Sequence, residues 1–205
     1  LGGGIGTRGP GEKKLEEDRR IIRDRISQLK RELEEVVKNR EVARAQRKRS
    51  AMPVISIVGY TNAGKSTLLN RLTDAGVLEE DKLFATLDPT TRNYTMESGQ
   101  QVLFTDTVGF IRKLPHHLID AFRSTLEEAK YADIILHMVD AANPKAYQQM
   151  HVVYETLQRL QIKDKPVITV FNKQDLPGAE QIKDLKADKT VKLSAKHGDG
   201  IKALL

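Results

Sequence analysis

The chain has 205 residues, of which 39% are hydrophobic, and this length allows one substantial domain with an appendage. It contains no Cys, which excludes a disulfide scaffold and fits a reducing compartment, and no apolar run of about 18 residues that could span a membrane. The net charge of +6 comes from residues 1–50, which carry 15 basic and 9 acidic side chains, whereas residues 51–205 carry 19 of each. A basic appendage on a neutral domain indicates a polyanionic partner, with nucleic acid the leading candidate.

The first elements expected are a loop and a helix. Residues 1–11 hold six of the fourteen glycines, which predicts a mobile loop that serves either as a linker or as a backbone that approaches a partner closely. Residues 12–49 predict one long helix, because neither Gly nor Pro interrupts them and apolar residues recur every seven positions. These residues are Leu15, Ile22, Leu29 and Val36, with Ile26 and Leu33 between them. The stripe predicts a second helix as its partner, which we expect upstream of this chain. The basic end, residues 40–49, is either a solvated helix end or a contact with RNA.

After a linker at residues 50–53, the pattern changes to apolar strands that alternate with helical segments. The predicted strands lie at 54–58, 102–105, 134–139, 167–171 and 191–193, with an antiparallel edge strand at 93–97 and a helix at 67–72. Runs of this kind are buried on both faces, so we predict an α/β domain over residues 53–205, with a mostly parallel sheet and helices on both faces. The chain starts without Met and ends in what resembles the start of a helix. We therefore expect an internal piece of a longer protein, with the last helix truncated.

A phosphate-binding loop is predicted directly after the first strand. The motif G-x-x-x-x-G-K-S/T is matched by Gly59, Tyr60, Thr61, Asn62, Ala63, Gly64, Lys65 and Ser66, and Thr67 follows at the start of a helix. Backbone N–H groups of the loop and the helix N-terminus favour phosphate oxygens. Lys65 is expected to reach the β- and γ-phosphates, and the Ser66 hydroxyl to bind Mg²⁺.

A second motif, D-x-x-G, follows the strand at 102–105 as Asp106, Thr107, Val108 and Gly109. Asp106 is expected to hold Mg²⁺ through water, and the Gly109 N–H to sense the γ-phosphate. Many nucleotide switches continue with a Gln that positions the attacking water, but here Phe110 follows and offers no polar atom. Help with hydrolysis must therefore come from a backbone group, from a cation near Asn62 or from a partner.

The base is predicted by two short stretches at later strand ends. Asn172, Lys173, Gln174 and Asp175 follow the strand at 167–171, and Ser194, Ala195 and Lys196 follow the last strand. A carboxylate at Asp175 can accept two hydrogen bonds from guanine, whereas adenine offers no such pair of donors, so the wrong base would leave this acceptor unpaired. The triplet 194–196 would supply a backbone N–H to the guanine carbonyl oxygen.

These four motifs, in this order and each after a strand, resemble the translation-factor-like class of P-loop GTPases over residues 53–205. The segments GTRGPGE, GYTNAGKST, LFATLDPTTR and DTVGFI, together with the long charged helix, resemble the HflX family across the whole chain. The resemblance implies a cytoplasmic enzyme that acts as a monomer and hydrolyses GTP to GDP and phosphate with Mg²⁺. It also implies binding to the large ribosomal subunit and its RNA through residues 1–50, and a role in ribosome dissociation. The alternative is a nucleotide-sensing ribosome-binding module, in which GTP binding drives the action and hydrolysis only allows release.

The resemblance also implies a switch Thr that binds Mg²⁺ only when the γ-phosphate is present. The stretch Phe84, Ala85, Thr86, Leu87 and Asp88 is similar to the first switch of the HflX branch, so the role is carried to Thr86, with Thr90 and Thr91 as alternatives. Lys65, Thr86 and Gly109 are then the candidate catalytic residues.

Other polar residues leave alternatives open. Some GTPases with an apolar residue after D-x-x-G hold K⁺ partly through an Asn in the phosphate-binding loop; Asn62 would do this or would only stabilise the turn. Arg112 and Lys113 form either an internal arginine finger or a solvated loop. His116 and His117 are expected at the surface or in a partner contact, whereas His137 is expected as a hydrogen-bonded core residue.

Overall fold

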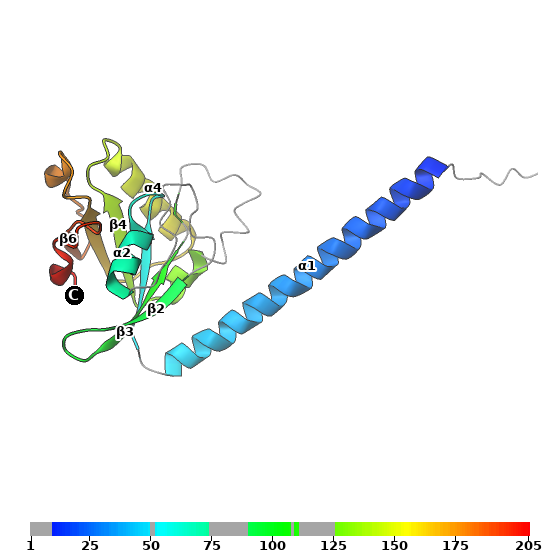
Figure 1. The fold of residues 1–205 in the computed structure, drawn as a ribbon, viewed down its shortest axis with the longest axis horizontal. Coiled ribbons are helices and arrows are strands. Elements are labelled where there is room, and N and C mark those ends of the chain that lie inside the picture. Colours follow the sequence, from blue (N-terminus) through cyan, green and yellow to red (C-terminus); the bar gives the residue numbers. More distant parts are fainter. Residues whose placement is uncertain (1–9, 50–51, 74–89, 108, 111–125) are drawn as a thin grey trace, which may run out of the picture. The chain divides into compact units, whose positions relative to one another are not determined.

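The computed structural model describes residues 10–49, 52–73, 90–107, 109–110 and 126–205. The chain divides into two compact units, Leu1–Ala51 and Met52–Leu205. The first unit contains helix α1 (Pro10–Arg49), and the second contains every other described element (Figure 1). The predictions for residues 1–9, for the switch at 84–88, for Val108 and for residues 112–117 lie outside the described part of the chain.

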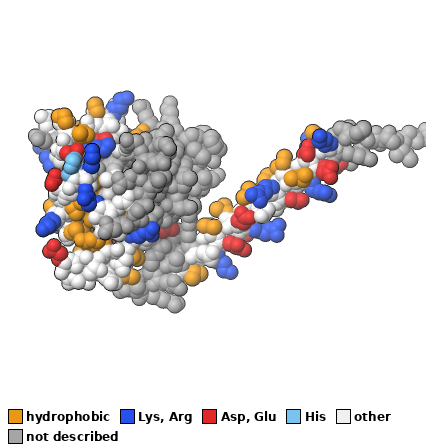
Figure 2. Space-filling model, in the orientation of Figure 1, with side chains coloured by type: hydrophobic (Ala, Val, Ile, Leu, Met, Phe, Trp, Pro, Cys, Tyr) orange, Lys and Arg blue, Asp and Glu red, His pale blue; other side chains and the backbone are white. Residues whose placement is uncertain are grey.

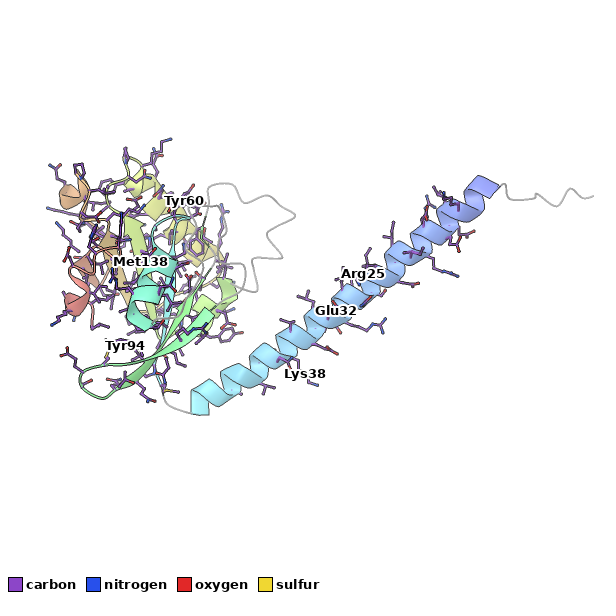
Figure 3. The ribbon with its side chains drawn as sticks, in the orientation of Figure 1. Arg25, Glu32, Lys38, Tyr60, Tyr94 and Met138 are labelled. Atoms are coloured by element: carbon purple, nitrogen blue, oxygen red, sulfur yellow. The ribbon has the colours of Figure 1, made fainter. Side chains whose placement is uncertain are left out.

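Helix α1 is unbroken over 40 residues and begins at Pro10, two residues before the predicted start, and it contains neither Gly nor Pro after Gly11. Its described apolar side chains are all exposed and stand among charged ones along the helix (Figure 2). Arg25 donates to Gln28 at 3.0 Å and Gln28 donates to Glu32 at 2.8 Å, so polar pairs three and four residues apart run beside the apolar stripe (Figure 3). A second helix packed on this stripe stays a prediction. Among the described residues, no helix is both long enough and apolar enough to cross a membrane.

The second unit is built on a six-stranded sheet with the order β2-β3-β1-β4-β5-β6. The strands are β1 (Val54–Gly59), β2 (Thr90–Thr95), β3 (Gln101–Asp106), β4 (Ile134–Asp140), β5 (Val167–Asn172) and β6 (Lys189–Lys192). Strand β2 runs antiparallel to β3, and all other pairs are parallel. The predicted mostly parallel sheet with an antiparallel edge strand is therefore confirmed.

The edge strand β2 begins three residues earlier than predicted, at Thr90–Thr95 instead of 93–97. A turn closes at Met96, where the Met96 N–H donates to Gln100 O at 2.9 Å and the Gly99 N–H donates to Met96 O at 2.8 Å. Gly99 has φ +82°, which favours glycine, so the chain has already left the strand at residues 96–97. The last strand is also earlier than predicted, at 189–192 instead of 191–193, although the Leu193 N–H still donates to Phe171 O.

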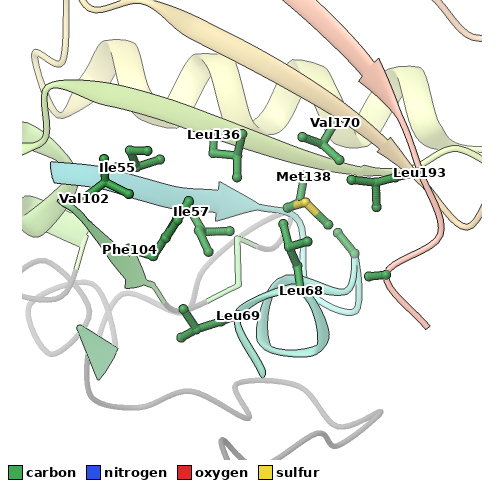
Figure 4. Packing of buried hydrophobic residues seen from close by; sticks show 12 residues of the cluster. Ile55, Ile57, Leu68, Leu69, Val102, Phe104, Leu136, Met138, Val170 and Leu193 are labelled. Carbon is green, nitrogen blue, oxygen red and sulfur yellow. The ribbon is translucent and has the colours of Figure 1, made fainter. Parts of the chain in front are cut away.

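Two helices cover opposite faces of the sheet. Leu68 and Leu69 of α2 (Lys65–Thr73) pack on one face, and Val153 and Leu157 of α4 (Ala146–Arg159) pack on the other. The sheet alternates accordingly: Ile55, Ile57, Phe104, Leu136, Met138 and Val170 point to the α2 face (Figure 4), and Val58, Ile135 and Phe171 to the α4 face. The short 3₁₀ turns are η1 (Glu127–Tyr131), η2 (Ala179–Gln181) and η3 (Ile201–Ala203). A central strand buried on both faces explains the continuous apolar run at 54–58.

His137 is a core residue, as expected, but among the described residues its Nδ1 atom lacks the expected hydrogen bond. The ring is 1% exposed and meets the Tyr154 ring edge-on at a centroid distance of 5.1 Å. Its Nδ1 has no hydrogen-bond partner in the described part of the chain and lies 3.9 Å from Asp184 Oδ2. Burial lowers the pKa of His137 to about 4, because it outweighs the attraction of Asp184.

This burial predicts a pH dependence of stability. Between pH 4 and 6.5 the unfolded state binds a proton that the folded state does not, so stability rises with pH in this window and falls as pH drops. At about 1.4 kcal/mol per pKa unit, His137 should account for about 3 kcal/mol lost between pH 7 and pH 4. The free energy of unfolding can be measured by chemical denaturation at several pH values across this range. It should change less steeply with pH in His137→Phe than in the wild type. Equal slopes would contradict the assignment.

Candidate nucleotide-binding site

The loop between β1 and α2 requires glycine at two places. A Cβ on Gly59 would lie 2.5 Å from Met138 O, and a Cβ on Gly64 would overlap the side-chain amide of Asn172. Gly64 also has φ +94°, and Asn62 adopts a left-handed φ of 63° at an exposed position. The Ala63 N–H donates to Tyr60 O at 3.2 Å and closes the turn. The loop therefore has the tight backbone that the motif predicts.

Two predicted metal ligands meet behind this loop. Ser66 Oγ donates to Asp106 Oδ2 at 2.9 Å, which joins the start of α2 to the C-terminal end of β3. Lys65 is buried, and its Nζ donates to Tyr60 O at 3.2 Å. Burial lowers the pKa of Lys65, and the neighbouring Asp106 carboxylate opposes this shift. The loop thus holds a desolvated amine close to the oxygens of Ser66 and Asp106, the two predicted metal ligands.

The segment after β3 runs alongside the phosphate-binding loop. The Phe110 N–H donates to Gly59 O at 2.9 Å and Phe110 O accepts from the Thr61 N–H at 2.8 Å, which forms a parallel bridge between Phe110 and Tyr60. Thr107 Oγ1 donates to Ile57 O at 2.8 Å. A Cβ on Gly109 would lie 2.7 Å from Thr61 Cα and 3.2 Å from Lys65 Nζ, so Gly109 is packed directly over the loop.

Phe110 itself lies in the core. Its side chain is 2% exposed and belongs to the cluster on the α4 face of the sheet, with Val58, Leu126 and Ala129. From the sequence, Phe110 was interpreted as a switch residue that lacks a polar atom. The structure shows a different reason for the apolar side chain, because position 110 does not face solvent.

Asn172, at the end of β5, joins two loops. Its Nδ2 donates to Ala63 O at 2.9 Å, and its Oδ1 accepts from the Ala195 N–H at 2.9 Å. Asn172 is 3% exposed. The side chain therefore ties the phosphate-binding loop to the triplet 194–196, a bridging contact that the sequence did not predict.

Asp175 is held as an ionised acceptor. Its Oδ1 accepts from Ser194 Oγ at 2.7 Å, and His197 Nε2 lies 3.6 Å from Oδ2. The Ser194 hydrogen bond is the largest cause that holds the pKa of Asp175 below its ordinary value. The Asp175 side chain is 24% exposed, so part of its carboxylate remains accessible.

The two residues between Asn172 and Asp175 have internal partners. Lys173 adopts φ 65°, and its Nζ lies 2.8 Å from Asp140 Oδ2. Gln174 Nε2 donates to Phe171 O at 3.2 Å and Ala179 O at 3.3 Å. Gln174 thus stabilises its own turn.

Sequence reasoning missed two residues at this site. Arg71, in the last turn of α2, donates from Nε to Ala195 O at 3.3 Å and from Nη2 to Lys196 O. Nothing in the helical pattern distinguishes Arg71 from a solvated residue. Asp140, the partner of Lys173, ends β4 opposite Asn172, and a carboxylate at a strand end was a usable signal.

Of the three candidates for the switch Thr, the structure describes two, Thr90 and Thr91. Thr86 and its neighbours at 84–88 lie outside the described residues. Thr90 lies opposite Asp106 in the β2–β3 register, and Thr91 Oγ1 is 3.1 Å from Thr105 Oγ1 within the sheet. The preference for Thr86 stays a prediction, and in this structure Thr91 is engaged by a neighbouring strand.

A phosphate-binding loop between β1 and α2, with motif residues at the ends of β3 and β5 and after β6, defines a P-loop GTPase domain. The chain belongs to the family of 50S ribosome-binding GTPases, whose model matches residues 54–173. Residues 1–47 match a second model, the GTP-binding GTPase middle region.

Known relatives agree with this class. GTPase HflX of Lacrimispora saccharolytica is 68% identical over 206 residues, which cover 100% of this chain and 49% of the relative. The HflX resemblance is therefore confirmed, and the chain spans about half the length of the curated relatives it matches.

Solved structures share the fold. A GTP-binding protein from Sulfolobus solfataricus in complex with GDP has a TM-score of 0.65 and 26% identity, covering 94% of this chain and 58% of that one. Era in complex with MgGDPNP and a segment of 16S ribosomal RNA has a TM-score of 0.58 and 30% identity, covering 75% of this chain and 55% of that one.

Proposed function

We propose that this protein binds GTP with Mg²⁺ and hydrolyses it to GDP and phosphate. The observation that carries the proposal is the contact of Asn172 with both Ala63 and Ala195, because it joins the phosphate-binding loop and the predicted base-binding loop into one site. A nucleotide has its phosphates and base at opposite ends, so a site for it needs both loops at a fixed separation.

The phosphate end fits Mg²⁺ and a triphosphate. Ser66 Oγ and Asp106 Oδ2 are hard oxygen ligands 2.9 Å apart, of the kind that Mg²⁺ prefers, with Asp106 acting through water. Bound Mg²⁺ would offset charge on the β- and γ-phosphates. Lys65 would hold a phosphate oxygen, whose negative charge favours the ammonium form that burial disfavours. Thr86 would complete the metal site, and Gly109, packed over Lys65 Nζ, would sense the γ-phosphate.

The base end fits guanine. The Asp175 carboxylate would accept from guanine N1–H and the exocyclic amine. The N–H groups of Ser194 and Ala195 already donate inside the protein, to Asp199 O and to Asn172 Oδ1, both at 2.9 Å. We therefore propose that the Lys196 N–H supplies the bond to the guanine carbonyl oxygen.

The attacking water needs a group other than the side chain at position 110, because Phe110 is buried. A cation near Asn62 or the ribosome would supply the missing positive charge. The left-handed φ of Asn62 supports its role in the turn and leaves its exposed side chain available for K⁺.

The partner we propose is the large ribosomal subunit, bound through its RNA by residues 1–50, with dissociation of ribosomes as the outcome. Support comes from the matched family of 50S ribosome-binding GTPases and from the confinement of the +6 charge excess to these residues. Residues 53–205 would form the GTP-binding domain, and the protein would act as a monomer in the cytoplasm.

GTP turnover by the full-length protein, measured with and without large subunits, tests this function. We expect slow basal release of phosphate that rises at least about tenfold with large subunits, because a supplied positive charge can accelerate phosphoryl transfer by about 10³–10⁵-fold. Small subunits serve as the control, and parallel series in K⁺ and Na⁺ report on Asn62. Turnover that stays flat at saturating large subunits would reject the proposed activator.

A further inference from the structure

Arg71 links the helix that follows the phosphate-binding loop to the predicted base-binding loop. Helix α2 begins at Lys65, and Arg71 lies in its last turn. From there its guanidinium donates to two successive carbonyls, Ala195 O at 3.3 Å through Nε and Lys196 O through Nη2. A Cβ on Gly198 would lie 3.8 Å from Arg71 Cζ, so the loop also passes within van der Waals range of the guanidinium.

The two carbonyls belong to the peptide planes that carry the recognition groups. A peptide is planar, so fixing Ala195 O also fixes the direction of the Lys196 N–H in the same plane. Fixing Lys196 O in the same way directs the His197 N–H, which donates to Ser194 Oγ at 3.3 Å. Ser194 Oγ in turn donates to Asp175 Oδ1 at 2.7 Å. Arg71 therefore begins a connected path that ends at the carboxylate proposed to accept from guanine.

We infer that Arg71 is a positioning residue for guanine recognition, which orients the Lys196 N–H and, through Ser194, the Asp175 carboxylate. This inference rests on the proposed GTP site. Arg71 is exposed and does not belong to the apolar core. Its side chain is therefore positioned by hydrogen bonds to the loop and not by apolar packing. The planar fork of Arg reaches two neighbouring carbonyls at once, which a Lys ammonium at the same position does not.

The test compares Arg71→Ala and Arg71→Lys with a matched control, Arg159→Ala, in the full-length protein. Arg159 also lies in the last turn of a helix, and its ion pair with Glu155 is exposed. GDP, IDP and ADP affinities and GDP dissociation rates are measured by stopped-flow fluorescence with labelled nucleotides. Thermal unfolding and kcat at saturating GTP are recorded alongside.

We expect Arg71→Ala to weaken GDP about tenfold, mainly through faster dissociation, which is the loss of about one charge-assisted hydrogen bond. IDP should weaken by a similar factor, because it shares the carbonyl that the Lys196 N–H would bind. ADP affinity, kcat and the melting temperature should stay near wild type. Arg71→Lys should lose about threefold, since one donor remains, and Arg159→Ala should match the wild type.

Two results would overturn the inference while leaving the proposed function standing. One is wild-type GDP affinity in Arg71→Ala, and the other is an equal loss for GDP and ADP, which would place the effect on the phosphate side. A wild-type protein with no preference for GDP over ADP would instead reject the guanine site itself.

Discussion

Phe110→Gln is expected to destabilise the GTPase domain by about 4 kcal/mol and to leave intrinsic GTP hydrolysis slow. Removal of a buried Phe side chain costs about 3–5 kcal/mol, and a Gln amide at a 2% exposed position adds an unpaired polar group. The amide would lie among Val58, Leu126 and Ala129, on the core side of the backbone. It would therefore not replace the water-positioning Gln of other switches.

Urea denaturation measures the stability change, and single-turnover hydrolysis measures the rate. Phe110→Leu is the graded control, expected to cost about 1–1.5 kcal/mol because it retains an apolar side chain. Leu185→Gln introduces the same amide at a position that is 96% exposed and should change stability by less than about 0.5 kcal/mol. A stable Phe110→Gln variant with fast intrinsic hydrolysis would refute the core assignment.

Asn172→Asp is expected to abolish most nucleotide binding although the two side chains have the same shape. One carboxylate oxygen still accepts from the Ala195 N–H, but the other replaces Nδ2 and faces Ala63 O, 2.9 Å away in the wild type. The variant exchanges a buried hydrogen bond for a repulsive contact of a buried charge, at a cost of about 3–5 kcal/mol. The two loops should separate in the free variant to relieve this contact, so GDP binding would have to restore it, which corresponds to a loss in GDP affinity of at least about 100-fold.

Calorimetric titration with GDP at pH 7 provides the measurement, and Asn93→Asp provides a matched control on the exposed face of β2. Lowering the pH should partly restore binding to Asn172→Asp, because protonation returns a donor to the side chain. Near-wild-type affinity in Asn172→Asp would show that the Ala63 contact does not hold the site together.

The elements that sequence predicts well here are those whose signal is local. The apolar runs of β1, β3, β4 and β5 reflect burial on both faces, and the motifs at 59–66, 106–109 and 172–175 follow β1, β3 and β5 directly. Because parallel strands run in the same direction, their C-terminal ends bring these distant motifs to one edge of the sheet, so the sequence alone was sufficient to assemble the candidate site.

The contacts that sequence did not predict join distant residues through groups without a local pattern. Asn172 bonds Ala63, 109 residues away, and Arg71 bonds Ala195, 124 residues away. Phe110 was interpreted as a switch residue because it follows the D-x-x-G motif. Its bridge to Tyr60, however, directs its side chain toward the core. The start of β2 was misplaced because β-propensity in an edge strand is weak, and a turn at Met96 decided its end.

The register of β2 limits how a change at the predicted first switch would reach the rest of the domain. Residues 84–88 precede β2 in the chain, and Tyr94 of β2 packs edge-on against Phe104 at a centroid distance of 6.1 Å. A slip of β2 by one residue would turn Tyr94 to solvent and Asn93 to the core, because successive strand residues face opposite sides. A gradual shift of β2 along β3 is therefore unfavourable. A displacement that enters β2 from the predicted switch would therefore have to separate β2 from β3, because the alternation of buried and exposed residues opposes a shift in register.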